Sequence, residues 1–177
     1  MAKKNRNLTT SDVVEILDWL EKAEIKVWLD GGWGHDAVLR EQTRQHDDLD
    51  LVGDVADSSK LEEVLTEKRF KVTERESTNA LVFTDSSDRQ VDVHLARFDE
   101  TGKGLYRMSN GEDWVFSPES LQGEGAIGER TVRCMTPEFQ MLCKTGDFEP
   151  TENDYQDVTL LHERFGVEIP EMYQTKH

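Results

Sequence analysis

The chain has 177 residues, of which 36% are hydrophobic and 33% are charged, and its formal net charge is −16. This length suffices for one domain with a real core, and the acidic charge disfavours nucleic acid and anionic membranes as partners while favouring cations. Acidity that merely keeps the protein soluble is an equal alternative. Two cysteines do not suggest a disulfide-rich secreted scaffold, and neither a signal peptide nor an apolar run of transmembrane length is found, so the expected location is the cytoplasm.

The first part of the chain alternates helical and strand periodicities. Asp12 is a candidate cap for the first helix, with Glu15 as its reciprocal partner. Gly31-Gly32 ends a short buried strand and precedes a short helix. In chain order, the predicted elements are a helix beginning near Asp12, a strand at 27–29, a helix at 33–39, a polar loop at 40–47, a strand around 48–51 and a helix at 58–68.

The second part of the chain is richer in strand patterns. A polar turn at 85–88 separates two strand patterns, as in a hairpin. Pro137 suits the first turn of a helix, and the tail after Pro170 is expected to fray. The predicted elements are strands at 70–74, 80–84, 91–95, 104–107, 113–116 and 130–134, then helices at 137–144 and 153–165. The order predicts an α+β fold, a small mixed sheet with helices packed on one face.

Three aspartates stand on predicted strands with alternating apolar neighbours. Asp48 and Asp50 are two residues apart, so their side chains share one face roughly 7 Å apart, a spacing at which two carboxylates can bind Mg²⁺. Asp92 has the same alternation on a later strand and would complete a three-carboxylate cluster if the strands are neighbours. Such a cluster repels itself without a cation. A lone Asp-x-Asp pair is more often only the solvated face of an edge strand.

The Gly31-Gly32 turn makes the metal interpretation more specific. Glycines between a strand and a helix let the backbone approach a phosphate, and the first turn of the helix offers free N–H groups. A Gly-Gly pair alone is usually only a turn. A strand, two glycines, a short helix and then Asp-x-Asp on the next strand together indicate a metal-assisted nucleotide site.

These motifs resemble a known group of enzymes. Residues 28–36 (WLDGGWGHD) and 43–50 (TRQHDDLD) resemble the signature of small antibiotic nucleotidyltransferases of the DNA polymerase β-like superfamily, in particular the lincosamide and aminoglycoside enzymes. Residues 91–94 are similar to the strand that carries the third carboxylate, and residues 131–134 and 142–160 also look similar. The resemblance covers about 10–166. It implies one nucleotidyltransferase domain at 8–170, with a catalytic core at about 8–96 and acceptor-side strands and C-terminal helices at about 97–170.

The resemblance also implies a reaction and roles for residues. A nucleoside monophosphate, AMP from ATP, would pass to a hydroxyl of a small antibiotic such as an aminoglycoside or lincosamide, with release of pyrophosphate. Asp48 and Asp50 would bind Mg²⁺ with the nucleotide, and Asp92 would act as general base or third metal ligand. The cradle for the β- and γ-phosphates would be formed by Gly31, Gly32 and Trp33.

Other polar residues are further candidates, each with a plain structural alternative. Arg44 and His46 precede the aspartate pair and could contact phosphate, or could belong to a solvated loop. Lys144 could bind the triphosphate, or could be a cation favoured at a helix C-terminus. Contacts to a cationic acceptor are assigned to Glu74, Glu76, Asp147 and Asp154, although carboxylates near 147–157 would equally suit a helix start. Departures from the lincosamide pattern, which leave the acceptor open, occur at His35, Lys144, Thr145 and Asp147.

Two other functions compete with antibiotic modification. One is a nucleotidyltransferase of the same fold that acts on a protein or tRNA acceptor, as in toxin–antitoxin modules; the charge of −16 weighs against tRNA. The other is a non-catalytic nucleotide-binding protein, against which the presence of all three aspartates weighs. The expected partners are a nucleoside triphosphate and a cationic small molecule, with the chain as a monomer or homodimer.

Overall fold

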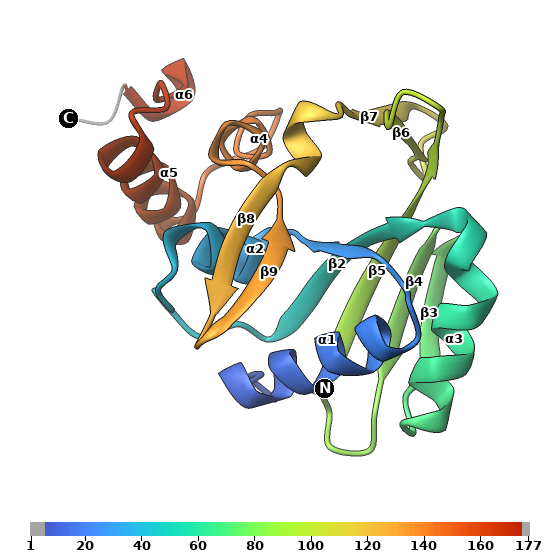
Figure 1. The fold of residues 1–177 in the computed structure, drawn as a ribbon. Coiled ribbons are helices and arrows are strands. Elements are labelled where there is room, and N and C mark those ends of the chain that lie inside the picture. The colour runs from blue at the N-terminus through green and yellow to red at the C-terminus, as the bar shows by residue number, and fades with distance from the viewer. Residues whose placement is uncertain (1–5, 175–177) are drawn as a thin grey trace.

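A twisted mixed sheet forms the centre of the computed structural model, which describes residues 6–174 (Figure 1). The strands are β1 (Val27–Leu29), β2 (Asp48–Asp54), β3 (Lys71–Ser77), β4 (Ala80–Thr84), β5 (Gln90–Phe98), β6 (Gly104–Arg107), β7 (Asp113–Phe116), β8 (Gly123–Ile127) and β9 (Arg130–Cys134). Their order is β3-β4-β5-β2-β1-β9-β8, and β6 and β7 extend from the end of β5 as a ribbon. The β2–β5 and β1–β9 pairs are parallel, and the other pairs are antiparallel.

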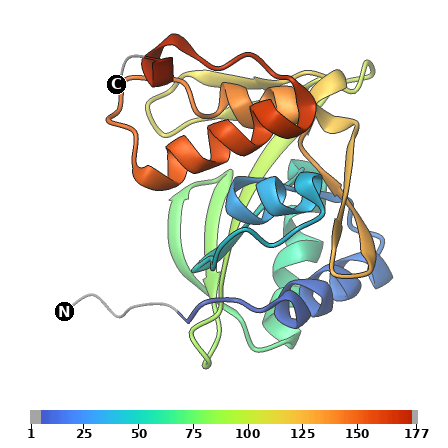
Figure 2. The same cartoon turned by 90° about the vertical axis from the view of Figure 1, so that its left-hand side faces the viewer.

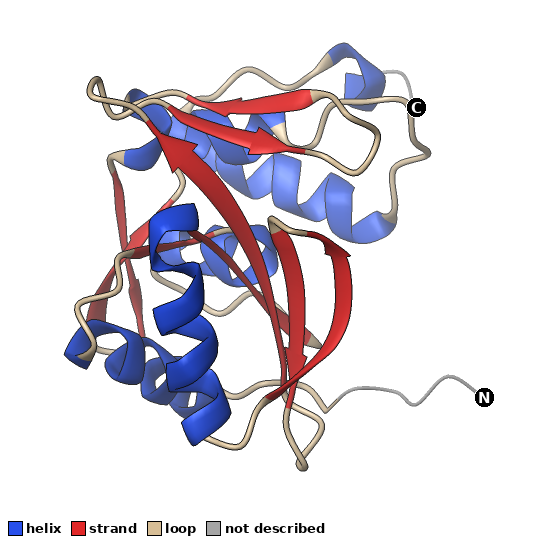
Figure 3. Cartoon of the chain, turned by 90° about the vertical axis from the view of Figure 1, so that its right-hand side faces the viewer, coloured by secondary structure: helices blue, strands red, loops and turns tan. Residues whose placement is uncertain are grey.

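Helices pack on the sheet and at one end of it. They are α1 (Thr10–Lys22), α2 (Gly31–Leu39), α3 (Ser58–Glu67), α4 (Pro137–Leu142), α5 (Glu152–Phe165) and α6 (Glu171–Gln174), with 3-10 turns at Val55–Asp57 and Glu119–Leu121. Figure 3 shows α1 and α3 together on one side of the sheet. Figure 2 shows α5 lying next to α2, away from α1 and α3. The expected α+β fold is confirmed. Within residues 6–174, no helix is long and apolar enough to cross a membrane.

The two faces of the sheet have different neighbours because strand side chains alternate. Leu51 of β2 and Val93 of β5 are buried in the main core, which also contains the apolar residues of α1 and α3. Trp28, Val52 and Ala96 point to the other face, where a second core forms with residues of β7 and α4. Asp50 and Asp48 precede Val52 by two and four residues along β2, so their carboxylates lie on the same face as Val52. The acidic residues therefore lie on the face opposite α1 and α3.

Two helix starts differ from the sequence-based expectation. Asp12 is not the cap of α1: Thr9 is the N-cap, and its hydroxyl accepts from the Asp12 backbone N–H at 3.2 Å while the Asp12 carboxylate accepts from the Thr9 N–H at 2.8 Å. Asp12 is thus the reciprocal member of the capping box, the role that we assigned to Glu15. Helix α2 begins at Gly31 instead of Trp33, with Asp30 as its N-cap, so both glycines belong to its first turn.

Two C-terminal segments were also wrongly predicted. Strand β8 is missing from the predicted elements because glycine is unfavourable in strands, yet a Cβ at Gly125 would collide with the Ala37 carbonyl of α2. Glycine is required there by the close approach of a helix. The residues just after Pro170 are not frayed as expected but form α6. Its Tyr173 side chain is buried, and the hydroxyl donates to the Lys144 carbonyl at 2.8 Å. Residues 175–177 lie outside the described part.

Candidate active site

The three predicted aspartates meet on two neighbouring strands. Strands β2 and β5 run parallel, with Asp50 directly opposite Asp92 and Asp48 opposite Gln90. The predicted adjacency of these strands is therefore confirmed. All three carboxylates are half-buried, and they lie on the sheet face that α1 and α3 leave free. The arrangement gathers negative charge at one end of the parallel pair.

Burial and mutual repulsion shift the acidity of these carboxyl groups. Burial raises the pKa of Asp92 to about 6, with further contributions from the charges of Asp50 and Asp48, although the Gln90 amide donates to Asp92 at 2.7 Å. Burial and the neighbouring charges of Asp50 and Asp47 likewise raise the pKa of Asp48. A bound cation would relieve this repulsion.

His94 and Asp30 extend the charged cluster on either side of Asp50. The His94 Nε2 atom lies 3.7 Å from Asp50 Oδ1. Burial alone would lower the pKa of His94, but the Asp50 carboxylate outweighs it and raises the pKa. Burial raises the pKa of Asp30, and the charge of Asp50 adds to this effect. Sequence reasoning did not select Asp30, although its position just before Gly31-Gly32 was a usable signal.

The Gly31-Gly32 turn lies directly against the carboxylate cluster. Gly31 has a φ of +56°, and a Cβ on it would lie 2.8 Å from Asp50 Cγ and 3.1 Å from Asp50 Cβ. A Cβ on Gly32 would collide with the His46 ring. The backbone N–H of Asp30 donates to the Asp50 carbonyl at 3.0 Å, and the Asp30 side chain makes no capping hydrogen bond. The first turn of α2 therefore brings backbone N–H groups beside Asp50, as an anion-binding helix start requires.

The carboxylates suit a magnesium ion that also binds phosphate. Within the part of the chain that the structure describes, no three histidine, cysteine or acidic side chains are gathered closely enough to hold a metal by themselves. Mg²⁺ commonly binds one or two protein carboxylates and completes its octahedron with phosphate oxygens and water. Asp48 and Asp50, mutually repelling on one face, fit that requirement.

Trp33 and His46 are buried and not open to a ligand. The Trp33 side chain is 1% exposed, so only its backbone could contribute to a phosphate cradle. His46 Nε2 lies 2.5 Å from Asp36 Oδ2, and its Nδ1 lies 3.0 Å from the Arg44 guanidinium. Since a carboxylate accepts and a guanidinium donates, Nε2 carries the proton and Nδ1 accepts. Both ring nitrogens are thus hydrogen-bonded, and the His46 ring packs against Gly32 and holds the Arg44 guanidinium.

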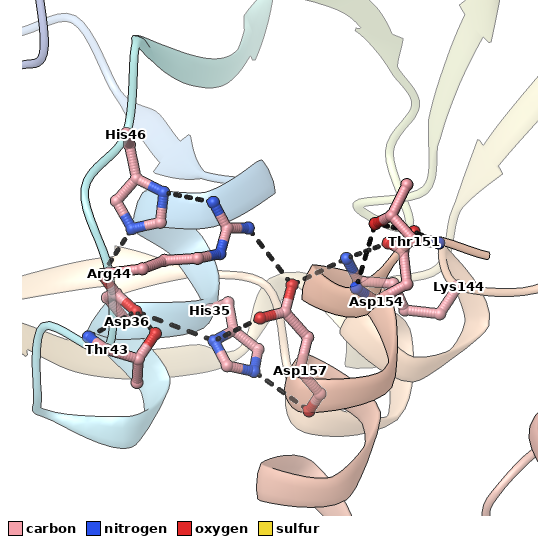
Figure 4. Close-up of polar contacts among 9 residues, drawn as sticks. All are labelled: His35, Asp36, Thr43, Arg44, His46, Lys144, Thr151, Asp154 and Asp157. Carbon is pink, nitrogen blue, oxygen red and sulfur yellow. Dashed lines mark hydrogen bonds and ion pairs between the residues drawn. The ribbon is translucent and has the colours of Figure 1, made fainter.

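Lys144 and Arg44 converge on a buried carboxylate of α5, Asp157 (Figure 4). Lys144 Nζ donates to Asp157 at 2.8 Å and to Asp154 at 2.9 Å, and Arg44 donates to Asp157 at 3.3 Å. Asp154 also forms the capping box of α5 with Thr151. The oxygens of Asp154 are therefore already bonded within the protein, and its predicted contact with an acceptor would have to compete with these bonds.

Glu74 lies on the same sheet face as the aspartates, whereas Glu76 falls in an irregularity of β3 between Arg75 and Ser77. Glu74 is opposite Val82, and Val82 is opposite Asp92, so these residues form one row across β3, β4 and β5. Arg75, between the two glutamates, points to the other face and pairs with Glu62 of α3. Both glutamates are exposed. Asp147, the remaining acceptor candidate, is exposed in the loop between α4 and α5.

A buried polar network was missed by sequence reasoning. Asp36 and Asp157 are each 1% exposed, and His35 is 2% exposed. Burial alone would raise the pKa of Asp36, but the His35 ring, 3.7 Å away, and hydrogen bonds from His46 and Thr43 hold that pKa well below its usual range. His35 Nε2 lies 3.1 Å from the Asp157 carbonyl, which joins α2 to α5. The usable signal was a pair of polar residues, His35 and Asp36, within an otherwise apolar helix.

The mixed sheet, the glycine turn at the start of α2 and the paired carboxylates of β2 and β5 are the features of a nucleotidyltransferase. The chain belongs to the aminoglycoside-2''-adenylyltransferase family, whose sequence profile matches residues 12–161. The antibiotic nucleotidyltransferase resemblance seen in the sequence is thereby confirmed.

Individual relatives agree with this family. A lincosamide resistance protein of Staphylococcus haemolyticus is 27% identical over 155 residues, which cover 88% of this chain and 95% of that protein. A 2''-aminoglycoside nucleotidyltransferase of Klebsiella pneumoniae is 29% identical over 120 residues, which cover 68% of this chain and 63% of that protein.

Solved structures show the same fold. The lincomycin-bound lincosamide antibiotic adenylyltransferase LnuA has a TM-score of 0.78 at 26% identity, over 88% of this chain and 98% of that one. The structure of ANT(2'')-Ia in complex with adenylyl-2''-tobramycin has a TM-score of 0.65 at 20% identity, over 87% of each chain. The second likeness is one of fold alone.

Proposed function

We propose that this protein transfers a nucleoside monophosphate, AMP from ATP, to a hydroxyl of a small antibiotic such as an aminoglycoside or a lincosamide. The reaction depends on Mg²⁺ and releases pyrophosphate. The observation that carries the proposal is the pairing of Asp50 with Asp92, with Asp48 on the same face and the Gly31 turn in contact with Asp50. This arrangement combines a metal site with an anion-binding helix start.

Asp48 and Asp50 hold the metal, and the start of α2 holds the phosphates. Magnesium supplies charge neutralisation of the triphosphate and orients its α-phosphorus. The backbone N–H groups of Gly31, Gly32 and Trp33 bind phosphate oxygens where no side chain intervenes. Lys144 and Arg44 add positive charge. Burial alone would lower the pKa of Lys144, but the bonds to Asp157 and Asp154 outweigh this effect and raise that pKa. Lys144 therefore stays cationic.

Asp92 serves as the general base. The acceptor hydroxyl passes its proton to the Asp92 carboxylate as its oxygen forms a bond to the α-phosphorus, and the bond from that phosphorus to pyrophosphate breaks. Without a metal, burial and the charges of Asp50 and Asp48 raise the pKa of Asp92 to about 6, so this carboxyl is more basic than an ordinary aspartate. A cation on Asp48 and Asp50 would offset their charges, while the effect of burial would remain. A base with a pKa near the working pH is the favourable case, and such catalysis contributes roughly 10²–10⁴-fold in rate.

The acceptor binds beside Asp92 along the exposed acidic row of the sheet. Glu74 lies on the face of Asp92, Glu76 follows it two residues later along β3, and both carboxylates are exposed. Amino groups of a cationic acceptor would pair with these carboxylates, and Asp147 would add charge from the α4–α5 loop. The family match and the antibiotic ligands of the related structures support this acceptor class.

An acceptor screen tests the proposal. The protein is incubated with Mg-ATP and panels of aminoglycosides and lincosamides, and both pyrophosphate and product mass are measured. We expect at least one compound to gain a single adenylyl group, and none to do so when Mg²⁺ is removed by a chelator. Pyrophosphate release without any modified panel member would reject the antibiotic acceptor while keeping the nucleotidyl transfer. Nucleotide binding with no turnover would instead indicate the non-catalytic alternative.

A further inference from the structure

A single buried oxygen connects the two cations of the site. Asp157 is 1% exposed, and its Oδ2 accepts from Lys144, just after α4, and from Arg44, in the loop before β2. These two segments are far apart in the sequence and both bond to the same residue of α5. Figure 4 shows both side chains reaching the same carboxylate from different sides.

The bonds to Asp157 leave donors for an anion. An ammonium has three N–H donors, and Lys144 uses two of them, on Asp157 and Asp154. A guanidinium has five N–H donors, and Arg44 directs one nitrogen to Asp157 and another to His46. Both cations are therefore held in place while each keeps N–H donors that these bonds do not use.

Both cations lie beside the glycine turn. Burial and the charge of Asp50 raise the pKa of Asp30, the N-cap of α2. Lys144 is near enough to Asp30 for its positive charge to oppose this rise. Arg44 is bonded to His46, whose ring lies directly against Gly32. Both cations are therefore near the first turn of α2, where the phosphates are proposed to bind.

We propose that Asp157 is a positioning residue that holds Lys144 and Arg44 in place for the β- and γ-phosphates of the nucleotide. The inference rests on the proposed nucleotidyl transfer. Long cationic side chains lose rotamer freedom when they bind a ligand, and a fixed partner in the free protein removes much of that cost. Asp157 contributes to nucleotide affinity in this way without touching the nucleotide.

The test compares ligands with and without the terminal phosphates. Binding of Mg²⁺ with α,β-methylene-ATP, and of AMP, is measured by calorimetry for the natural sequence and for Asp157→Asn. The asparagine has the same shape but no charge. We expect the triphosphate analogue to bind about tenfold more weakly to the variant, since hydrogen bonds between charged groups have that order of effect, and AMP binding to change less than about twofold.

Two further variants separate positioning from general damage. Asp85→Asn is the matched control, because Asp85 is also buried and bonded to an arginine, Arg89, but lies in the β4–β5 turn. It should lower the melting temperature without changing affinity for the analogue. In a Lys144→Met background, adding Asp157→Asn should weaken binding much less than it does alone, because residues that act through one another are not additive.

The outcomes are distinguishable. Equal affinity of Asp157→Asn and the natural sequence for the analogue would overturn the positioning role while leaving the proposed function intact. An equal loss for the analogue and AMP would also overturn it. If the natural sequence bound neither ligand, the proposed function would fail together with this inference. If Asp157→Asn does not fold, Arg44→Gln, at the more exposed end of the network, should show the same selective loss for the triphosphate, and an unchanged affinity would overturn the proposal.

Discussion

Replacing Gly31 with alanine tests the contact between the glycine turn and the carboxylates. Gly31 has a φ of +56°, and an alanine there incurs a backbone cost of about 1–2 kcal/mol in the free energy of unfolding. Its Cβ would also lie 3.1 Å from Asp50 Cβ, an atom that the strand backbone fixes. Rotating the Asp50 side chain cannot remove that contact, so strand β2 or the turn must shift.

The added Cβ would also lie 2.8 Å from Asp50 Cγ, so the carboxyl group must move as well. We expect the two movements together to reduce kcat/KM for pyrophosphate release by about 100-fold, the effect of a displacement of roughly 1 Å at a reacting centre. Gly166→Ala is the matched control. Gly166 ends α5 with a φ of +71°, but a Cβ there has nothing within 4 Å. Urea denaturation should show a loss of stability for both variants, larger for Gly31→Ala because of the added contact with Asp50, with activity lost only in Gly31→Ala. Full activity of Gly31→Ala, or an equal loss in Gly166→Ala, would refute the reasoning.

Three further predictions concern single carboxylates. Asp92→Asn should lower kcat by about 10²–10⁴-fold, and an unchanged kcat would remove Asp92 from its role as base. Burial alone would raise the pKa of Asp12, but hydrogen bonding led by Arg6 lowers that pKa from 3.8 to about 2. The ionised Asp12 therefore stabilises the folded protein fully above pH 4, and this contribution is lost as the pH falls towards 2. The urea midpoint should then lose the equivalent of about 1–2 kcal/mol over that range, and Asp12→Asn should lose less. Asp36→Asn removes the charged acceptor of His46 and should cost about 3 kcal/mol of unfolding free energy; a cost below about 1 kcal/mol would contradict the importance of the buried network.

The side of the site that carries the three aspartates was predictable because its signals are local. Alternation along β2 and β5 placed Asp48, Asp50 and Asp92 on polar faces, and the only non-local assumption was that these strands are neighbours. The glycine turn was recognisable from the chemistry of glycine between a strand and a helix. The structure added the physical reason for Gly31, which is its contact with Asp50.

The network around Asp157 was not predictable, because its contacts are long-range. Arg44 and Asp157 are separated by 113 residues, and no spacing rule connects them. The carboxylates near the start of α5 looked equally like helix-start residues or acceptor contacts, and Asp154 does serve in a capping box. Strand β8 was missed for a different reason: Gly125 indicated a loop, whereas its lack of a side chain allows α2 to approach.

The most direct test of the account is Mg²⁺-dependent pyrophosphate release by Asp50→Asn compared with Asp54→Asn. Both aspartates lie on β2, four residues apart and on the same face, but Asp54 is at the far end of the strand, where its carboxylate accepts from the Ala56 N–H at 2.9 Å. We predict that Asp50→Asn abolishes the Mg²⁺-dependent release while Asp54→Asn retains it. Release by Asp50→Asn at the rate of the natural sequence would contradict the assignment of the metal centre to the Asp48–Asp50 pair.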